Sequence, residues 1–319
     1  MTWILASAYG VFLVISGYAL PSIRSKSIAR LLGWSIAALT VVVSHGMTIG
    51  QDPLIRMIVI VFLQLLSMKA LVAIEFYPGG IGLSFTQWTA FTAGWFGMKP
   101  QPFERLVHSS LPIGGLLTKA LSRVLIGFIL LLLSVKVETL QPGFFLPQLC
   151  LLAGISFVFH FGVLALSVAW WRMLGVDIEE LFRAPYRSYS LKEFWGKRWN
   201  LAFSEMTALV AYRPLKSVMG TQYAMTFSFL FSGLLHEIAI SLPVMSGFGL
   251  PMAYFAIHAT AMQLEGRSRI VKALLTHRLM ARVWVAAFLI LPMPLLFHHQ
   301  FVLEVMIPMR TTLLALVGF

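Results

Sequence analysis

Cysteine and charged residues are scarce in this chain of 319 residues. The one cysteine, Cys150, lies inside an apolar run, which excludes a disulfide within the chain and a metal site built from several cysteines. Charged residues make up only 11% of the sequence, whereas hydrophobic residues make up 59%. Soluble domains carry about 25% charged residues, so this composition is typical of an integral membrane protein.

The chain also lacks any stretch that could serve as a linker, because no segment is rich in serine, proline or charge. A repeat of fixed period is absent as well. We therefore predict one domain that covers residues 1–319. The N-terminal Met1-Thr2-Trp3-Ile4 has no basic stretch of the kind found in a cleaved signal peptide, so the first apolar run is expected to be a retained span.

Long apolar runs dominate what remains. A spanning helix needs about 20 mostly apolar residues, because backbone polar groups cannot stay unpaired in lipid. The alternating pattern of a transmembrane barrel is absent from the sequence. We predict an all-α fold, a polytopic transmembrane helix bundle of about nine spans. They are expected at residues 3–20, 31–49, 54–76, 111–135, 145–170, 223–245, 249–265, 283–298 and 300–318.

Two further stretches are predicted to be amphipathic helices at the membrane interface. In 81–97, aromatic residues recur every three or four positions, which favours a helix with aromatic anchors; they are Phe85, Trp88, Phe91 and Trp95. Residues 201–219 show a weaker form of the pattern. A short re-entrant hairpin or a tilted span is the alternative for both.

Basic residues are distributed unevenly along the chain. The net charge of +12 would suggest a nucleic-acid partner in a soluble protein. Here most of the 24 lysines and arginines lie in loops 21–30, 77–110, 171–222 and 266–282, which share one side of a nine-span topology. We therefore place these loops in the cytoplasm and the N-terminus outside or in a lumen, and we expect no nucleic-acid partner. The membrane would be a bacterial inner membrane or the endoplasmic reticulum.

Ionisable residues inside a span are costly, so each one is a candidate for function. The candidates are His45, Lys69, Glu75, His160, His236, Glu237, His258 and Arg310. A lone histidine is usually a hydrogen-bonded packing residue, but His236 has Ser232 on the same helix face and Glu237 directly after it. A zinc-protease motif is excluded because the sequence has Ile240 where a second histidine is needed. A neutral imidazole in a low dielectric can act as a general base, and we predict this role for His236.

The second candidate site is the segment 185–200, which combines aromatic and basic residues such as Trp195, Lys197, Arg198 and Trp199. One interpretation is an interfacial belt that carries the positive charge of a cytoplasmic loop. The other is a binding site for an anionic, partly aromatic ligand such as a phosphorylated nucleotide carrier. The sequence has no glycine-rich phosphate loop, so ATP-driven chemistry is not supported.

Both segments resemble a known family, the membrane-bound O-acyltransferases, and most closely its wax synthase branch. The resemblance rests on Phe194-Trp195-Gly196-Lys197-Arg198-Trp199-Asn200 and on His236 in Ser-Gly-Leu-Leu-His-Glu. Met68-Lys69 and residues 94–100 are similar to that branch too. Other branches carry Phe-Tyr-x-Asp-Trp-Trp-Asn, and this chain has Lys197 and Arg198 in place of Asp and Trp. This departure argues against the sterol and diacylglycerol acyltransferases as nearest relatives.

The resemblance implies an acyl-CoA-dependent O-acyltransferase, with a wax ester as the expected product. Acyl-CoA would be the co-substrate, a long-chain or other lipophilic alcohol the acceptor, and no metal or further cofactor is expected. His236 would be the general base and Asn200 a catalytic hydrogen-bond donor. The residues expected to bind substrate are Trp199, Arg198, Lys197, Trp195, Ser232 and Glu237. A homo-oligomer in the bilayer is left open.

Two other functions stay open at this point. A transporter or channel could relay protons through intramembrane histidine and glutamate, but it predicts inverted repeats that the sequence does not show. A scaffolding protein would use His236 only for packing. The geometry poses a question as well, because His236 lies about 20 Å into a span that starts at Tyr223, at 1.5 Å per residue. Asn200 precedes that span, so the two meet only if its segment dips into the bundle or the site is a long tunnel.

Overall fold

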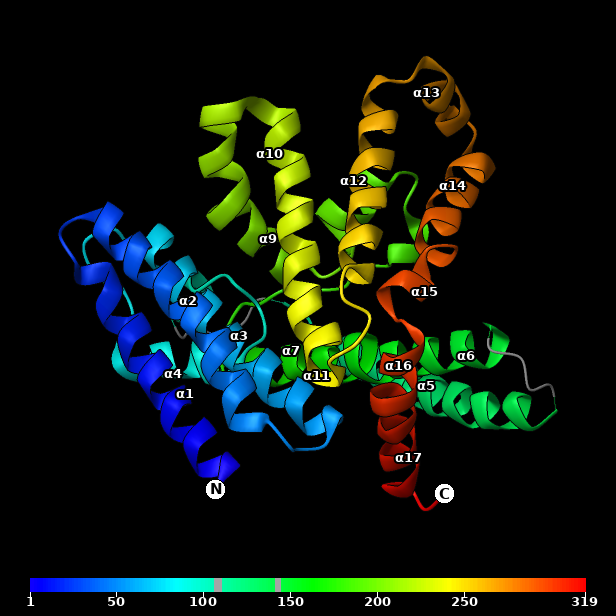
Figure 1. Ribbon diagram of the computed structural model, residues 1–319, viewed down its shortest axis with the longest axis horizontal. Coiled ribbons are helices and arrows are strands. Elements are labelled where there is room, and N and C mark those ends of the chain that lie inside the picture. The colour runs from blue at the N-terminus through cyan, green and yellow to red at the C-terminus, as the bar shows by residue number, and fades with distance from the viewer. Residues whose placement is uncertain (106–110, 141–144) are drawn as a thin grey trace. The chain divides into compact units, whose positions relative to one another are not determined.

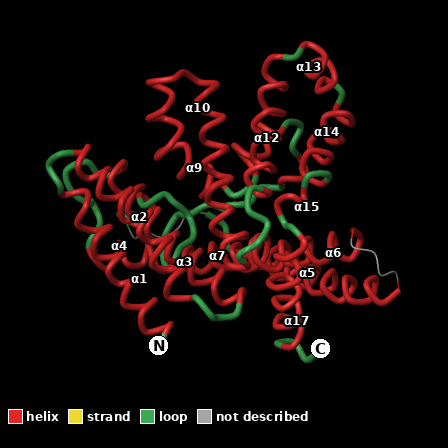
Figure 2. Tube along the Cα trace, in the orientation of Figure 1, coloured by secondary structure: helices red, strands yellow, loops and turns green. Residues whose placement is uncertain are grey.

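The computed structural model describes residues 1–105, 111–140 and 145–319, and every regular element within them is helical. Figures 1 and 2 show the helices and the loops between them. In this part of the chain, seven stretches are long and apolar enough to cross a membrane: Thr2–Ser22, Lys26–Thr48, Pro53–Phe76, Gly114–Leu140, Leu146–Met173, Leu201–Val244 and Arg278–Leu296. The protein is an all-α, multi-pass integral membrane protein, as the sequence predicts.

The described residues form α-helices in the following chain order. They are α1 (Thr2–Ala19), α2 (Lys26–Thr48), α3 (Pro53–Phe76), α4 (Phe85–Gly94), α5 (Gly114–Leu140), α6 (Phe145–Ser156), α7 (Leu164–Met173), α8 (Leu191–Glu193), α9 (Leu201–Thr207), α10 (Arg213–His236), α11 (Leu242–Val244), α12 (Leu250–Arg267), α13 (Arg269–Thr276), α14 (Arg278–Ile290), α15 (Met293–Leu296), α16 (His299–Phe301) and α17 (Ile307–Ala315). Turns of π-helix extend several of them: Phe157–Val163, Phe194–Arg198, Ala208–Tyr212, Glu237–Ser241 and Val302–Met306.

Two of the nine predicted spans are not among the seven stretches. Helix α12 forms where residues 249–265 predict it, but polar residues such as Glu265 and Arg267 in its last turns reduce its apolarity. The predicted run 300–318 consists of two short helices, α16 and α17, joined by the π-helical turn Val302–Met306. Both segments are helical, so the sequence predicts the fold class correctly. It overestimates the number of helices in the described residues that are long and apolar enough to cross a membrane.

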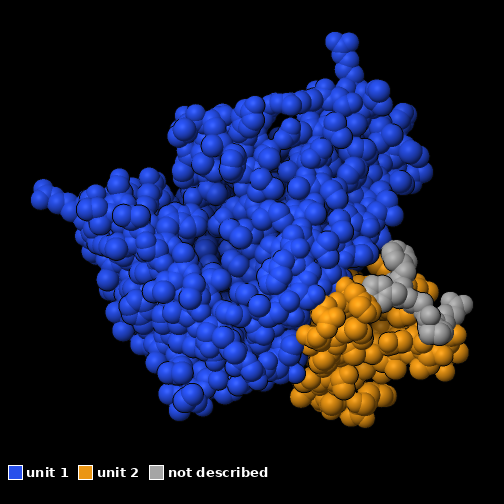
Figure 3. All heavy atoms as spheres, viewed as in Figure 1, with its two compact units in different colours: residues 1–100, 183–298 blue, residues 101–182, 299–319 orange. Residues whose placement is uncertain are grey.

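The described chain divides into two compact units, which Figure 3 distinguishes by colour. Unit 1 consists of residues 1–100 and 183–298, and unit 2 of residues 101–182 and 299–319. Every residue predicted to be catalytic or to bind substrate lies in unit 1. The single domain that the sequence suggests stays a prediction.

Helices α1, α2 and α3 form one packed group in unit 1. Leu13 of α1 is buried against Leu63 and Leu66 of α3. A Cβ added to Gly17 would lie 3.1 Å from the Cβ of Ala70, so a glycine is needed for this close approach of α1 to α3.

The predicted amphipathic helix at 81–97 forms as α4, but its aromatic residues do not anchor it at an interface. Trp88 and Phe91 are fully buried and Trp95 is only 4% exposed, so Phe85 is the one exposed member of the four. The indole Nε1 of Trp88 donates a hydrogen bond to the carbonyl oxygen of Val14 in α1, at 2.8 Å. The aromatic face of α4 is therefore covered by protein, which corrects the prediction of aromatic anchors.

Lys69 in α3 holds the C-terminal end of α4. Its side chain is fully buried, and Nζ donates hydrogen bonds to the carbonyl oxygens of Phe91, at 2.5 Å, and of Trp95. The ammonium group also lies 4.1 Å from the centre of the Phe91 ring. A cation at a helix C-terminus satisfies carbonyl groups that have no partner within the helix. Lys69 is therefore explained by the packing of α4 on α3.

Helices α9 and α10 belong to one helical segment of 44 residues, Leu201–Val244, which turns at Gly220. The backbone of Gly220 has φ 80° and ψ 169°, a conformation open essentially to glycine alone. Figure 1 shows the two limbs on either side of this turn. Residues 201–219, predicted to lie at the interface, form the first limb. The predicted span 223–245 forms the second, which ends at His236 and the π-helical turn after it.

In unit 2, two arginines of the apolar segments are paired with glutamates. Arg310 in α17 is buried, and its Nη1 donates to Oε2 of Glu138 in α5, at 2.8 Å, and to the hydroxyl of Ser134, at 3.3 Å. Arg123 of α5 pairs with Glu180 at 2.9 Å. These pairings explain Arg310 and Arg123 without a ligand, because a charge inside an apolar segment is costly unless it is paired.

Candidate active site

His236 is the last residue of α10 and precedes the π-helical turn Glu237–Ser241. Its Nδ1 lies 2.7 Å from the carbonyl oxygen of Ser232, one turn earlier. A carbonyl oxygen can only accept, so Nδ1 carries the proton and Nε2 keeps its lone pair. The ring is partly exposed, and among the described residues Nε2 has no hydrogen-bond partner. This tautomer is the one that a general base needs.

Ser232 contributes its backbone to this arrangement. Its hydroxyl group donates to the carbonyl oxygen of Ser228, at 3.0 Å, and the side chain is buried. The helical spacing that the sequence shows thus brings Ser232 and His236 together, through the Ser232 carbonyl. Substrate binding by the Ser232 side chain stays a prediction.

Two aromatic rings flank the His236 imidazole. The centre of the Phe203 ring lies 5.4 Å from it, and that of Phe255 lies 4.4 Å from it. Phe203 belongs to α9 and Phe255 to α12, so three separate elements meet at this histidine. Phe255 is 2% exposed. The sequence analysis did not identify either residue, because an isolated phenylalanine in an apolar run carries no distinguishing signal.

Asn200 begins α9, the helix that contributes Phe203. Its Oδ1 accepts a hydrogen bond from the backbone N–H of Phe203, at 3.3 Å, as an N-terminal cap. Its backbone is left-handed, with φ 42°, a conformation that asparagine tolerates better than most residues. Because Phe203 contacts His236, the segment that starts at Asn200 does reach the histidine. Among the described residues, the amide nitrogen of Asn200 donates to no partner, so it can serve a ligand.

Trp195 lies in the π-helical turn before Asn200 and has hydrogen bonds at both ends. Its indole Nε1 donates to Nδ1 of His258 in α12, at 3.1 Å. Its carbonyl oxygen accepts from the hydroxyl of Ser204 in α9, at 2.5 Å. Its ring also lies 5.7 Å from that of Phe255, between centres. Trp195 thus connects the elements that surround His236, and its predicted contact with substrate stays a prediction.

Trp199 lies in a packed region. Its ring stacks on Phe194, with centres 5.4 Å apart and planes at 15°. Both residues pack against a buried cluster that includes Leu191, Ala261 and Val285. These contacts explain Trp199 as part of the protein core, and its role in substrate binding stays a prediction.

Arg198 and Lys197 differ in their surroundings. Arg198 donates to Oε1 of Glu193, with Nη2 at 2.6 Å and Nε at 2.7 Å, and its Nη1 reaches the carbonyl oxygen of Arg183 at 3.3 Å. Burial raises the pKa of Glu193, but hydrogen bonds from the Tyr189 N–H and from Arg198 outweigh it and hold the pKa below its ordinary value. Lys197 is exposed. Arg198 therefore holds the loop together, and substrate binding by Lys197 stays a prediction.

Glu237 holds the start of α12. Its Oε1 accepts hydrogen bonds from the backbone N–H groups of Gly249, at 2.9 Å, and Met252, at 3.0 Å. A carboxylate here satisfies N–H groups that lack a partner within the helix and interacts favourably with the helix dipole. Glu237 thus fixes α12, which carries Phe255 and His258, against α10. Its role in substrate binding stays a prediction.

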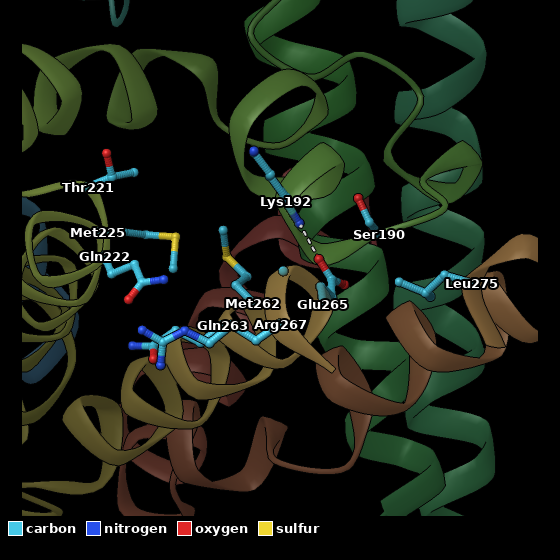
Figure 4. A pocket seen from close by; sticks show the side chains of 11 residues that line it. Ser190, Lys192, Thr221, Gln222, Met225, Met262, Gln263, Glu265, Arg267 and Leu275 are labelled. Atoms are coloured by element: carbon cyan, nitrogen blue, oxygen red, sulfur yellow. Dashed lines mark hydrogen bonds between the residues drawn. The ribbon is translucent and has the colours of Figure 1, made fainter. Parts of the chain in front are cut away.

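A cavity of about 350 Å³ lies between α10 and α12, bordered by α8 and α13. Lys192 and Arg267 bring positive charge to its wall, and Figure 4 shows Lys192 next to Glu265. The Glu265 carboxylate accepts from the backbone N–H groups of Leu191, at 2.7 Å, and Lys192, at 3.2 Å. Ser190 and Lys192 belong to the candidate segment 185–200, whereas the lining residues from α10, α12 and α13 carry no signal in the sequence.

Metal ligands are not gathered in this part of the molecule. Within the residues that the structure describes, no group of three or more histidine, cysteine, aspartate or glutamate side chains is placed to hold a metal ion. The surroundings of His236 are apolar, with the rings of Phe203 and Phe255 beside its imidazole.

Comparison with known proteins identifies the segment that contains this arrangement. Residues 178–257 match the model of the "Membrane bound O-acyl transferase family". The chain is 38% identical over 73 residues to a "Long-chain-alcohol O-fatty-acyltransferase" of Simmondsia chinensis, which covers 20% of this chain and 21% of that protein. It is 39% identical over 74 residues to "Probable long-chain-alcohol O-fatty-acyltransferase 7" of Arabidopsis thaliana, which covers 21% and 22%.

A relative of another substrate class matches too. "Acyl-CoA--sterol O-acyltransferase 1" of Arabidopsis thaliana is 33% identical over 91 residues, or 26% of each chain. The similarity thus spans between a fifth and about a quarter of these relatives. Trp195, Asn200 and His236 all lie inside residues 178–257. By this segment, the chain is similar to the membrane-bound O-acyltransferase family.

Proposed function

We propose that this protein transfers a fatty acyl group from acyl-CoA to the hydroxyl group of an apolar alcohol, with His236 as the general base. The observation that carries the proposal is the hydrogen bond between Nδ1 of His236 and the Ser232 carbonyl, at 2.7 Å. It leaves the Nε2 lone pair available, inside the segment that matches the acyltransferase family. The names of the relatives point to long-chain alcohols and sterols as the class of acceptor, with wax ester formation as our first expectation.

The reaction needs one proton to be moved twice. Nε2 of His236 takes the proton of the alcohol hydroxyl as its oxygen attacks the carbonyl carbon of the thioester. The tetrahedral intermediate then collapses, the bond between carbon and sulfur breaks, and the CoA thiolate leaves. The imidazolium returns its proton to the thiolate, so His236 ends neutral and is ready for another cycle. The Phe203 and Phe255 rings beside the imidazole favour an apolar alcohol at this position.

Asn200 would stabilise the negative charge that develops on the carbonyl oxygen. Its Oδ1 is occupied as the cap of α9, whereas its amide N–H groups have no partner among the described residues. A fixed donor in a site shielded from water stabilises an oxyanion strongly, because it needs no reorganisation during the reaction. The hydrogen bond of Oδ1 at the start of α9 orients the side chain, and the amide N–H groups would then donate to the oxyanion.

The cavity between α10 and α12 would take the polar part of acyl-CoA. Lys192 and Arg267 in its wall suit the phosphate groups, and Met225 and Met262 provide apolar contacts. Met225 precedes His236 by eleven residues of α10, which is about 16 Å at 1.5 Å per residue. An extended pantetheine arm could pass along the helix from the cavity to the histidine. Lys197 would add a further contact from the neighbouring loop.

The test uses the purified protein in lipid nanodiscs, with radiolabelled acyl-CoA and a panel of long-chain alcohols and sterols. His236→Asn keeps a donor for the Ser232 carbonyl but removes the basic nitrogen, so we expect ester formation to fall by about 10²- to 10⁴-fold. His277→Gln, at an exposed histidine, is the matched control and should keep full activity. Activity of His236→Asn above about a tenth of the wild type would contradict the role of general base.

A wild-type protein that forms no ester with any alcohol would contradict the proposed function itself. Proton flux through liposomes that contain the protein would then favour the transporter considered above.

A further inference from the structure

His258 is fully buried in α12 and takes no part in the proposed chemistry. Its Nδ1 lies 3.1 Å from the indole Nε1 of Trp195, and the two rings meet at 90° with their centres 5.3 Å apart. An indole N–H can only donate, so Nδ1 of His258 must be the acceptor and must lack a proton. The contact therefore requires a neutral His258 in one particular tautomer.

Trp195, which His258 holds by this contact, also contacts the elements that carry the two aromatic rings beside His236. On one side, its ring packs on Phe255, whose own ring lies 4.4 Å from the His236 imidazole. On the other side, its carbonyl oxygen accepts from Ser204, in the helix that also carries Phe203. The two aromatic walls of His236 thus share one supporting residue.

We propose that His258 is a positioning residue that holds Trp195 by this hydrogen bond and thereby sets both aromatic walls of His236. The inference rests on the proposed function for its catalytic meaning, but the geometry that it predicts can be measured without catalysis. His258 touches neither substrate nor the reacting atoms in this account. It acts through Trp195.

A packing role alone makes a different prediction from a positioning role. Phenylalanine fills most of the space of histidine but cannot accept a hydrogen bond. Asparagine is smaller, yet its Oδ1 occupies the position of Nδ1 and can accept from the indole. If His258 only fills space, His258→Phe should disturb the site of His236 less than His258→Asn does. If His258 holds Trp195, His258→Asn should disturb the site less, despite the cavity that it leaves.

The experiment compares Trp195→Phe, His258→Phe, the double variant and His258→Asn in the same nanodiscs. Trp88→Phe is the matched control, because it also deletes an indole hydrogen bond, to the Val14 carbonyl at 2.8 Å, in another part of unit 1. A misplaced base costs about 10- to 100-fold in rate. We expect kcat to fall in this range for Trp195→Phe and His258→Phe, with little change in the KM for acyl-CoA. The double variant should be no worse than either single one, because both remove the same contact.

A second readout is independent of activity. Diethyl pyrocarbonate modifies accessible neutral imidazoles, and peptide mass spectrometry reports the rate at His236 alone. We expect this rate to rise severalfold in Trp195→Phe and His258→Phe and to return towards the wild-type value in His258→Asn. Trp88→Phe should leave both readouts unchanged.

Two results would overturn the inference: equal effects of Trp195→Phe and Trp88→Phe, or an His258→Asn variant no closer to wild type than His258→Phe. If the wild type forms no ester, the proposed function fails, and the modification rate of His236 alone decides whether His258 positions its walls.

Discussion

Replacing Asn200 with aspartate separates the two roles that the structure gives to this side chain. Aspartate keeps the oxygen that accepts from the Phe203 N–H, at 3.3 Å in the wild type, and it caps helices about as well as asparagine. It also tolerates the left-handed backbone, with φ 42°, that this position requires. The change keeps the cap and replaces the amide donor by a carboxylate oxygen, so the fold should be preserved while the stabilisation of the oxyanion is lost.

The expected loss follows from the number of donors removed. Deleting one donor to an oxyanion costs about 10²- to 10³-fold in kcat. The added carboxylate would also repel the developing negative charge. We therefore expect kcat of Asn200→Asp to be reduced by about 10³-fold, the larger value of this range. Asn200→Gly is the matched variant for the backbone, since glycine keeps the left-handed conformation but loses both the cap and the donor. It should lose activity to a similar extent and stability in addition.

The assay is ester formation from labelled acyl-CoA under single-turnover conditions, together with a thermal unfolding curve for each variant. We expect the melting temperature of Asn200→Asp to be close to that of the wild type and its rate of ester formation to be strongly reduced. A rate within about threefold of the wild type would refute it, because a lost oxyanion donor costs far more. A rate that falls only in step with the melting temperature would show that Asn200 serves α9 alone.

Other predictions concern the loop around Glu193 and the topology. Lys197→Gln should raise the KM for acyl-CoA severalfold and leave the melting temperature unchanged, whereas Arg198→Gln should lower the melting temperature, because its ion pair with Glu193 at 2.6 Å is lost. Since the pKa of Glu193 is lowered in the fold, this pair stabilises the protein above the ordinary carboxyl pKa and fails as the pH falls. The difference in melting temperature between wild type and Glu193→Gln should therefore shrink below about pH 4. Single cysteines at Lys192 and Lys272, in a background without the native cysteine, should react with an impermeant reagent from the same side, and labelling from opposite sides would contradict the predicted topology.

The sequence was sufficient for the fold class because membrane spans depend on local properties, length and apolarity, that one stretch of chain displays by itself. It was not sufficient to say what covers each helix. Trp88 and Phe91 recur with helical spacing, and α4 forms, but their partner Val14 lies in a different helix. Lys69 is a similar case, because a buried cation is acceptable only beside the carbonyls at the end of α4. Such pairings need the tertiary fold, which a hydropathy pattern does not contain.

The residues of the site divide in the same way. The sequence could identify His236 and Ser232 because a helix brings residues four apart into contact. The sequence could not show that Arg198 and Lys197 have different roles, because both are adjacent basic residues. Only the structure shows that Arg198 forms an ion pair with Glu193.

The resemblance to the family marks the segment from Trp195 to Asn200 as important without saying how each residue contributes. In the structure, the side chains of Trp195 and Arg198 direct their polar groups into hydrogen bonds with His258 and Glu193. Lys197 is exposed, and the amide N–H groups of Asn200 have no partner among the described residues. A segment can be functionally essential when only some of its side chains meet substrate, because the others determine where those side chains lie. Alanine substitution would therefore reduce activity at nearly every position of this segment, and only paired variants such as Asn200→Asp with Asn200→Gly, or Lys197→Gln with Arg198→Gln, can distinguish contact with substrate from support.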